Sequence, residues 1–194
     1  MKKKMVSFLV SGNGSNFQAV AEKILSGHIH AEPGIVISSS SEAFALERAK
    51  KLGIKSIAIE PKIFASKDAY ESEMIKHLNL CKTDLIVAAG YMRILSPKFI
   101  QKFRNKIINI HPSLLPAFPG KNAQQQALDY GVKITGCTTH FIDEGIDTGT
   151  IIMQSAVSID VNDNINTLSA KILKEEHTIL INSVKLFCED RLVI

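Results

Sequence analysis

Two polar side chains, Asn109 and His111, stand at the end of a short apolar stretch over residues 107–110. They are two residues apart, so on a strand they would share one face of the sheet. The loop that follows holds three prolines within eight residues, which fit neither a helix interior nor the centre of a sheet. An amide donor and an imidazole beside a rigid loop could stabilise an oxyanion and move a proton. The alternative is that Asn109 caps a turn and His111 is an ordinary loop histidine.

Asp147 is a third candidate, in a loop over residues 143–149 that carries three acids. The spacing of these acids differs from that of an EF-hand loop, and the sequence therefore favours no metal site. By itself Asp147 could equally be a solvated loop acid. His140 lies just inside the end of the preceding predicted strand, where a satisfied core histidine is the plainer interpretation.

A glycine-rich turn over residues 11–16 separates a predicted strand, residues 6–10, from a helical apolar pattern that begins at Phe17. Ser15 and Gln18 have the spacing of a capping box. The free N–H groups of a helix start attract anions, most often phosphate. The pattern matches neither the dinucleotide fingerprint nor the P-loop, which disfavours a nucleotide cofactor. A plain tight turn is the alternative.

Glu176 falls within the apolar stripe of the last predicted helix, between Ile172 and Ile179. A carboxylate on the buried side of a helix costs free energy unless it is paired or binds something. We therefore expect Glu176 either to bind a ligand or to belong to an internal ion pair.

The elements that must position these residues alternate along the first half of the chain. Strands are predicted over residues 6–10, 34–37, 54–59, 84–89 and 107–110, with helices from residue 15 and over residues 42–51, 67–80 and 98–103 between them. This order predicts a parallel, doubly wound α/β sheet with right-handed crossovers. Ligands of such sheets bind beyond the carboxyl ends of the strands. The loops over residues 11–16, 90–95 and 109–120 should therefore converge on one edge.

The second half of the chain predicts a different sheet geometry. A helix over residues 123–130 precedes strands over residues 133–142 and 150–157, and these strands are joined by too few residues for a helix. They should therefore be antiparallel, which makes the sheet mixed. A long helix over residues 164–187 follows, and residues 192–194 could form a small final strand.

Composition bounds the class of protein. The chain has 194 residues, 45% hydrophobic and 22% charged, which predicts one globular domain. Its net charge of +4 is too mild to argue for nucleic acid, and no apolar run reaches transmembrane length. No signal peptide is evident, and the three cysteines match no metal spacing. We expect a cytoplasmic protein that binds neither membrane nor nucleic acid.

Four motifs, in chain order, resemble those of the phosphoribosylglycinamide formyltransferase family, which is folate-dependent and belongs to purine synthesis. They are residues 11–16 (Ser-Gly-Asn-Gly-Ser-Asn), 92–97 (Met-Arg-Ile-Leu-Ser-Pro), 109–116 (Asn-Ile-His-Pro-Ser-Leu-Leu-Pro) with 118–120 (Phe-Pro-Gly), and 140–147 (His-Phe-Ile-Asp-Glu-Gly-Ile-Asp). The resemblance covers almost the whole chain. The trio of Asn109, His111 and Asp147 alone marks a wider superfamily that uses 10-formyltetrahydrofolate. The first motif and the Pro-Gly at 119–120 narrow the resemblance from this superfamily to the phosphoribosylglycinamide formyltransferase family.

The resemblance implies a Rossmann-like formyltransferase fold, with a mostly parallel central sheet, antiparallel strands at the C-terminal end and helices on both faces. It implies a single domain over residues 1–194. Residues 1–104, approximately, would form the phosphoribosyl-binding half, and residues 105–194 the folate-binding and catalytic half.

The resemblance also implies roles for particular residues. Asn109, His111 and Asp147 would be catalytic, with His140 behind them. Gly14, Ser15, Asn16 and Glu176 would bind the phosphoribosylglycinamide. The folate would be bound by Lys67, Met92, Arg93, Ile94, Leu95, Asn109, Asp143 and Glu144. Lys67 stands where the family often has arginine; it keeps the charge but loses the bidentate fork, which concerns folate affinity rather than the chemistry.

The implied reaction transfers a formyl group from 10-formyltetrahydrofolate, a co-substrate, to the amine of N1-(5-phospho-D-ribosyl)glycinamide through a tetrahedral intermediate. Asn109 and His111, as the imidazolium, would stabilise the oxyanion. Asp147 would favour the charged histidine and, with water, pass the proton. Neither a metal nor a covalent enzyme intermediate is required. The expected partners are small molecules, and the chain would be a monomer or a homodimer.

Three alternatives stay open. A 10-formyltetrahydrofolate hydrolase would use the same trio on water, although those enzymes carry an extra N-terminal domain. An initiator-tRNA formyltransferase would have a different loop after its Leu-Leu-Pro, an RNA-binding C-terminal domain and a more basic surface. A non-enzymatic Rossmann-like nucleotide-binding module would need the glycine fingerprint that is absent here.

Overall fold

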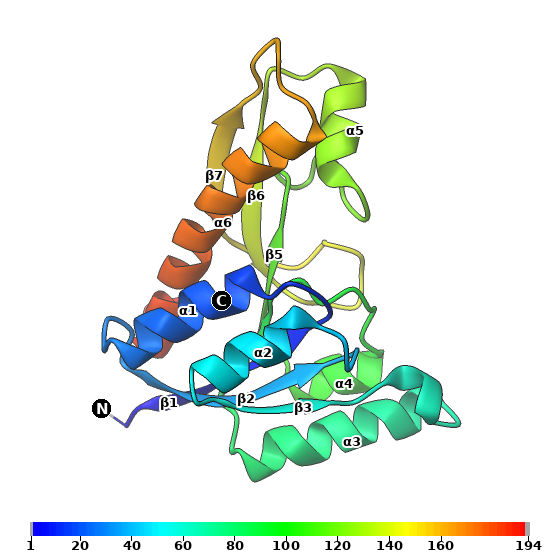
Figure 1. Cartoon of the computed structure of the whole chain (residues 1–194), viewed down its shortest axis with the longest axis vertical. Coiled ribbons are helices and arrows are strands. Elements are labelled where there is room, and N and C mark those ends of the chain that lie inside the picture. Colours follow the sequence, from blue (N-terminus) through cyan, green and yellow to red (C-terminus); the bar gives the residue numbers. More distant parts are fainter. Residues whose placement is uncertain (1, 193–194) are drawn as a thin grey trace.

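Seven strands form one mixed sheet, in the order β3-β2-β1-β4-β5-β6-β7, in the computed structural model, which describes residues 2–192 (Figure 1). The strands are β1 (Lys4–Val10), β2 (Ala31–Ser38), β3 (Lys55–Ala58), β4 (Leu85–Ala88), β5 (Ile107–His111), β6 (Ile134–Phe141) and β7 (Ile151–Ser158). The first five run parallel, whereas β6 is antiparallel to β5 and β7 to β6. The predicted mostly parallel sheet with antiparallel strands at its C-terminal end is confirmed.

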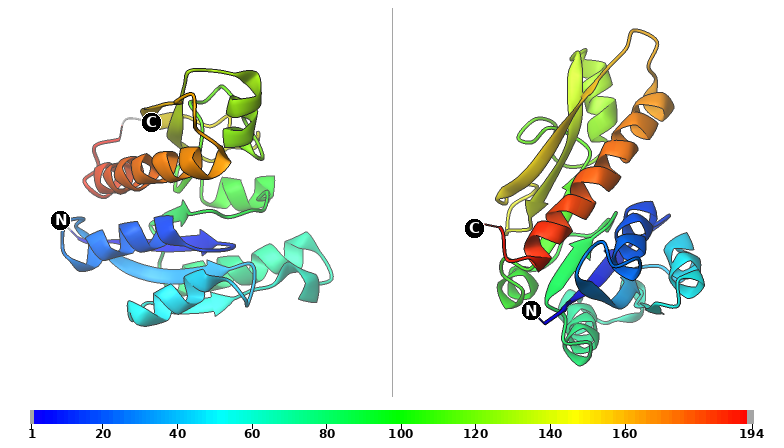
Figure 2. Two further views of the ribbon diagram at one scale, coloured as in Figure 1. Left: turned by 45° about the horizontal axis from the view of Figure 1, so that its top comes forward. Right: turned by 90° about the vertical axis from the view of Figure 1, so that its left-hand side faces the viewer.

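Helices cover both faces of the sheet, as expected. They are α1 (Ser15–Leu25), α2 (Phe44–Lys51), α3 (Lys67–Leu80), α4 (Pro97–Lys102), α5 (Ala123–Tyr130) and α6 (Ile165–Cys188), with a short 3-10 helix at Pro61–Ile63 that the sequence did not predict. The apolar residues of α1, α2 and α6 share one buried cluster, and those of α3 and α4 share another. In Figure 2 (left), β6, β7, α5 and α6 gather on one side of the part that holds β1, β2 and β3.

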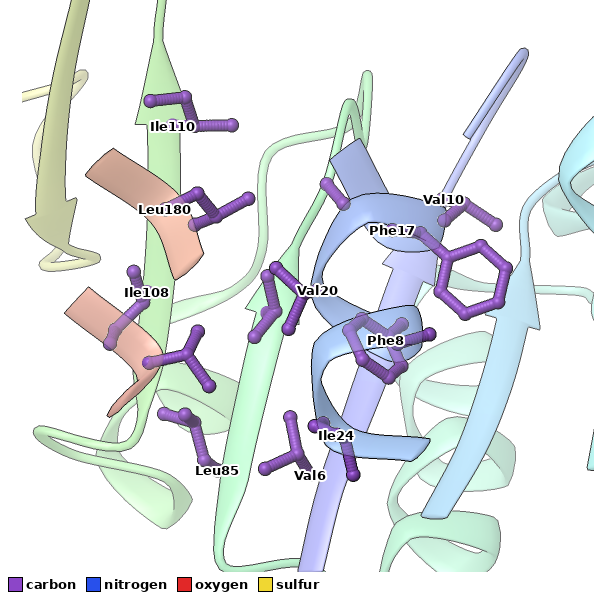
Figure 3. Packing of buried hydrophobic residues seen from close by; sticks show 14 of the residues in the cluster. Val6, Phe8, Val10, Phe17, Val20, Ile24, Leu85, Ile108, Ile110 and Leu180 are labelled. Atoms are coloured by element: carbon purple, nitrogen blue, oxygen red, sulfur yellow. The ribbon is translucent and has the colours of Figure 1, made fainter. Parts of the chain in front are cut away.

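Alternation along the strands divides the core between the two faces. Figure 3 shows Val6, Phe8 and Val10 of β1 packed with α1, together with Ile108 and Ile110 of β5. The intervening residues turn to the other face, because successive side chains of a strand point to opposite sides. Asn109 and His111 alternate with Ile108 and Ile110, so their shared face, predicted from the spacing, is fixed by burial of the isoleucines. Complete burial of each such side chain contributes about 1.5–3 kcal/mol.

Two local predictions need correction. Strand β2 begins at Ala31, earlier than expected, although it contains Pro33. Its first three residues pair with β1 but not with β3, so that the ring of Pro33 interrupts no ladder on that side, and the register with β1 shifts just after Pro33. The small strand expected over residues 192–194 has no counterpart at Leu192. The rest of that segment lies outside the described residues.

Within residues 2–192, no helix combines the length and the apolar character that crossing a membrane requires.

Candidate active site

The trio expected from the sequence comes together at the carboxyl end of β5. His111 Nδ1 lies 3.3 Å from Asp147 Oδ2, and the same carboxylate oxygen accepts a 2.8 Å hydrogen bond from the Gly120 N–H. Asp147 is held with a positive φ of 55°, a conformation that aspartate tolerates better than most residues. The loops after β5 and after β6 therefore meet at one carboxylate. Within this arrangement His111 is buried and Asn109 half-buried.

Both ring nitrogens of His111 face hydrogen-bond acceptors. Nε2 donates to the carbonyl oxygen of Phe118 over 2.9 Å, while Nδ1 faces Asp147. A carbonyl oxygen can only accept, so Nε2 carries a proton, and an ionised Asp147 calls for a second proton on Nδ1. An imidazolium would present a proton to each of these two acceptors. The geometry differs from the expectation in one respect. The 112–120 loop folds back over the ring, so Nε2 already donates to an acceptor within the protein.

His140 lies beside Asn109, which it faces across the β5–β6 ladder. Its Nδ1 donates to the carbonyl of Phe141 over 2.9 Å, which leaves Nε2 to accept a 3.1 Å hydrogen bond from Asn109 Nδ2. Burial lowers the pKa of His140, against smaller opposing effects of the Phe141 carbonyl and Asp147. A neutral His140 thus fixes the orientation of the Asn109 amide. The separation of 3.6 Å between Nε2 and Asp147 Oδ1 is then proximity rather than an ion pair.

A buried polar network lies behind the trio and was not predicted from the sequence. Thr138, fully buried and paired with His111 in the sheet, donates through Oγ1 to the Ser113 carbonyl over 2.7 Å. The same oxygen accepts from Leu115 N–H and from Gln154 Nε2, at 3.1 and 3.0 Å. Ser113 Oγ in turn donates to the Ala117 carbonyl. The network fixes the loop that presents Phe118 to His111. Thr138 is two residues from His140 on the same strand, and this spacing could have identified it.

The 143–149 loop is shaped by its own first acid. Asp143 Oδ1 accepts hydrogen bonds from Gly145 N–H, at 3.1 Å, and from Thr148 Oγ1, at 2.7 Å. A Cβ at Gly149 would lie 1.8 Å from the Phe141 carbonyl oxygen, so that only glycine permits this approach. Glu144 is exposed. Asp143 therefore has a structural role in holding Asp147 in place, whatever it binds.

The glycine-rich turn after β1 forms a small pocket. Gly14 precedes α1 in the left-handed conformation, and a Cβ there would lie 2.5 Å from that of Ala45. No side chain caps α1, so the predicted capping box of Ser15 and Gln18 is wrong: Gly14, rather than Ser15, occupies the N-cap position. A pocket of about 240 Å³ is lined by residues 11–16 together with Ala89, Gly90 and Met92. The uncapped N–H groups suit an anion.

Glu176 is bonded to a residue of this pocket and lies within electrostatic reach of His111. Asn16 Nδ2 donates a 2.8 Å hydrogen bond to Glu176 Oε2, in a buried position. Burial raises the pKa of Glu176, against the opposing effects of the Asn16 hydrogen bond and of His111. Asn16 Oδ1 is buried without a hydrogen-bond partner among the residues described. Glu176 joins no ion pair within residues 2–192, so the internal ion pair considered from the sequence is not found.

The loop after β4 lies against both the glycine-rich turn and α3. Met92 N–H donates to Ser11 Oγ over 2.9 Å, and Arg93 stacks over the ring of Tyr70, with its guanidinium carbon 5.9 Å from the ring centre. Met92 and Ile94 are 79% and 71% exposed, whereas the Leu95 side chain is packed in the core. The expected folate-binding residues of this loop thus present two apolar side chains and one cation to solvent.

Glu71 links Lys67 to the loop after β4. Its Nζ is 3.9 Å from Glu71 Oε1, and the same oxygen accepts a 2.8 Å hydrogen bond from Ser96 N–H. Ser96 also caps α4. The buried Glu71 therefore ties the start of α3, where Lys67 stands, to the end of the 92–95 stretch.

No group of three or more histidine, cysteine, aspartate or glutamate side chains within the described part of the chain is arranged to hold a metal ion.

Residues 3–184 match the model of the formyl transferase family. The phosphoribosylglycinamide formyltransferase of Bacillus subtilis is 44% identical over 174 residues, which are 90% of this chain and 89% of that protein. The crystal structure of glycinamide ribonucleotide transformylase 1 from Symbiobacterium toebii superposes with a TM-score of 0.97 at 42% identity, covering 99% of this chain and 91% of that one. The chain belongs to the phosphoribosylglycinamide formyltransferase family.

The chain is also 46% identical over 178 residues to a trifunctional purine biosynthetic protein, adenosine-3, of Drosophila melanogaster. It spans 91% of its own length in that match but 13% of the trifunctional protein.

Proposed function

We propose that this chain transfers the formyl group of 10-formyltetrahydrofolate to the amine of N1-(5-phospho-D-ribosyl)glycinamide, a step of de novo purine synthesis. The observation that carries the proposal is that Glu176, bonded to Asn16 of the anion pocket, lies within electrostatic reach of His111, which itself faces Asp147. A substrate that carries a phosphate and a reactive amine would occupy the anion pocket and the trio at the same time.

The ribonucleotide would reach from the anion pocket toward the trio. Its phosphate would accept hydrogen bonds from the N–H groups of residues 14–16, where α1 has no side-chain cap. Its ribose hydroxyls would donate to Glu176 and to the unpartnered Oδ1 of Asn16. The glycinamide amine would then extend toward His111.

The folate would bind between the 92–95 stretch and the 143–147 loop. The exposed side chains of Met92 and Ile94 suit an aromatic ring, and the cations of Lys67 and Arg93 suit the carboxylates of the folate tail. Leu95 would contribute through its backbone, because its side chain is buried in the core. Asp143 and Glu144 supply acceptors on the other side.

The chemistry follows from the trio. The amine nitrogen bonds to the formyl carbon, and the carbonyl electron pair moves to oxygen. Asn109 Nδ2–H and the His111 imidazolium stabilise that oxyanion, with Nε2 exchanging the Phe118 carbonyl for the substrate oxygen. The proton of the attacking nitrogen passes through Asp147 and water to the folate nitrogen, whose bond to the formyl carbon breaks.

An absorbance assay tests the proposal. The protein is incubated with 10-formyltetrahydrofolate, with and without N1-(5-phospho-D-ribosyl)glycinamide, and release of tetrahydrofolate is followed. The proposal predicts release that depends on the amine. Equal release without the amine would indicate the hydrolase, and binding of NAD with no release would indicate a nucleotide-binding module.

A further inference from the structure

Arg48, on α2, makes three hydrogen bonds to the residues around the glycine-rich turn. Nε donates to the Asn13 carbonyl over 2.9 Å, and Nη2 donates to Asn13 Oδ1 over 2.8 Å. Nη1 donates to Gln18 Oε1, in the first turn of α1. The Arg48 guanidinium thus contacts two atoms of Asn13, the residue before Gly14, and one atom of Gln18 in the helix after it.

The contact with the Asn13 carbonyl has a geometric consequence for Gly14. The peptide unit is planar and trans, so its C=O and N–H point in opposite directions. Because Arg48 holds the Asn13 carbonyl on its own side, the Gly14 N–H of the same peptide must point away from Arg48. Asn13 and Gly14 both line the pocket of about 240 Å³. A rotation of that peptide would change the direction of one pocket donor.

Arg48 has no direct carboxylate partner among the described residues, although Glu22 accepts a hydrogen bond from Gln18, which Arg48 also contacts. Its hydrogen-bond partners, Asn13 and Gln18, are neutral, and within residues 2–192 it forms no ion pair. Its charge reaches α6: after burial, Arg48 is the next largest cause that lowers the pKa of His177, against a smaller opposing effect of Glu22. A cation without a carboxylate partner beside an anion pocket favours bound negative charge.

We propose that Arg48 is a positioning residue for phosphate binding: it aims the Gly14 N–H by gripping Asn13, and it adds positive charge beside the pocket. This inference rests on the proposed function, since it assigns the phosphate of the ribonucleotide to that pocket. Arg48 need not touch the phosphate for either effect.

The test compares three variants. Arg48→Met removes the grip and the charge, and Arg48→Lys keeps the charge but loses the fork. Lys51→Met is the matched control, because Lys51 is an exposed cation on the same helix, also near the Phe44 ring, and within residues 2–192 it has no hydrogen bond or ion pair with the turn. The dissociation constant for N1-(5-phospho-D-ribosyl)glycinamide is measured by calorimetry at low and high salt, together with both KM values.

We expect Arg48→Met to weaken ribonucleotide binding on the order of tenfold, as for loss of one charge-assisted interaction, and to reduce its salt dependence. Arg48→Lys should lie between this variant and the wild type. The KM for the folate should stay within about twofold of wild type in all three variants. Lys51→Met should bind as the wild type does.

Two results would overturn the role of Arg48. One is ribonucleotide binding by Arg48→Met that equals that of Lys51→Met. The other is an equal rise of both KM values in Arg48→Met and Arg48→Lys with a fall in melting temperature, which would make Arg48 structural only. If Arg48→Met does not fold, the same comparison is made with Arg48→Lys. A wild type that binds the ribonucleotide but transfers no formyl group would contradict the proposed function while leaving Arg48 testable by calorimetry.

Discussion

Asn16 and Glu176 stand 160 positions apart in the chain, yet a 2.8 Å hydrogen bond joins them in a buried position. Asn16 belongs to the first turn of α1, and Glu176 to the middle of α6. The bond therefore connects the helix that follows the glycine-rich turn with the helix that packs across the C-terminal strands. It also leaves Asn16 Oδ1 buried without a hydrogen-bond partner among the described residues.

Glu176→Gln tests whether this carboxylate serves the ligand or the fold. The amide keeps an oxygen to accept from Asn16, so folding should be retained, whereas a charged acceptor for ribose hydroxyls is lost. We expect the KM for the ribonucleotide to rise about tenfold, as for loss of a hydrogen bond to a charged group. The KM for the folate should change little. A collapsed melting temperature with an unchanged KM would make Glu176 a structural residue instead.

The pH dependence of Glu176→Gln has a definite sign. Burial raises the pKa of Glu176 in the folded state, so the folded protein binds its proton more tightly than the unfolded chain does. That contribution to stability is complete below the ordinary carboxyl pKa and is lost as the pH rises through the folded value. Relative to wild type, Glu176→Gln should gain stability as the pH rises above about 4.5. Urea unfolding between pH 4 and 8 measures this; a difference that shrinks with rising pH would contradict it.

For His140, the pH dependence of the stability has the opposite sign. Burial lowers its pKa, so the neutral ring contributes stability that is present above its ordinary value of 6.5 and is lost as the pH falls through the lower folded value. His140→Gln does not titrate in this range. The stability advantage of the wild type over His140→Gln should therefore be largest above pH 6.5 and should narrow on acidification. An advantage independent of pH from 8 to 5 would show that His140 is not held neutral.

Thr138 and Thr139 form a matched pair for the network behind His111. Both are fully buried on β6, but Thr139 Oγ1 bonds Ser183 on α6, over 2.7 Å, rather than the 112–120 loop. Valine at either position leaves buried partners unpaired, and each such partner costs about 1–3 kcal/mol of stability. Only Thr138→Val should also slow turnover, about tenfold, with Thr138→Ser restoring it. Equal turnover by Thr138→Val and Thr139→Val would show that Thr138 has no part in catalysis.

Much of this site was predictable because it depends on local rules. The spacing of two residues put Asn109 and His111 on one face, and the predicted bounds of α3 match the structure, in which Ser66 caps its first turn. The acceptor for His111 Nε2 could not be predicted. The carbonyl of Phe118 belongs to a loop that is held in part by Thr138, on a strand 20 residues further along the chain.

The wrong capping box at Ser15 has a similar cause. Its sequence pattern was present, but Gly14 in a left-handed conformation, packed closely on Ala45, sets where α1 begins. That contact between the turn and α2 is tertiary and leaves no local signature. The importance of Arg48 was missed for the same reason, since its partners Asn13 and Gln18 lie at least 30 residues away in the sequence.

Asp147 has the central role in the proposed mechanism, in which it would favour the imidazolium form of His111 and carry the proton in the transition state. Asp147→Asn is nearly isosteric, and asparagine tolerates the positive φ of this position. Its amide oxygen can still accept from Gly120 N–H, so the loop should keep its place. The negative charge beside His111 Nδ1 is lost.

The most direct measurement compares the steady-state kinetics of Asp147→Asn with those of the wild type, for both substrates at neutral pH, with amine-dependent formyl transfer as the readout. We expect turnover to slow by a factor on the order of 10²–10⁴, or about 3–5 kcal/mol of barrier, with both KM values roughly unchanged. A near-normal turnover rate would contradict this mechanism and would leave Asp147 a loop acid that only anchors Gly120.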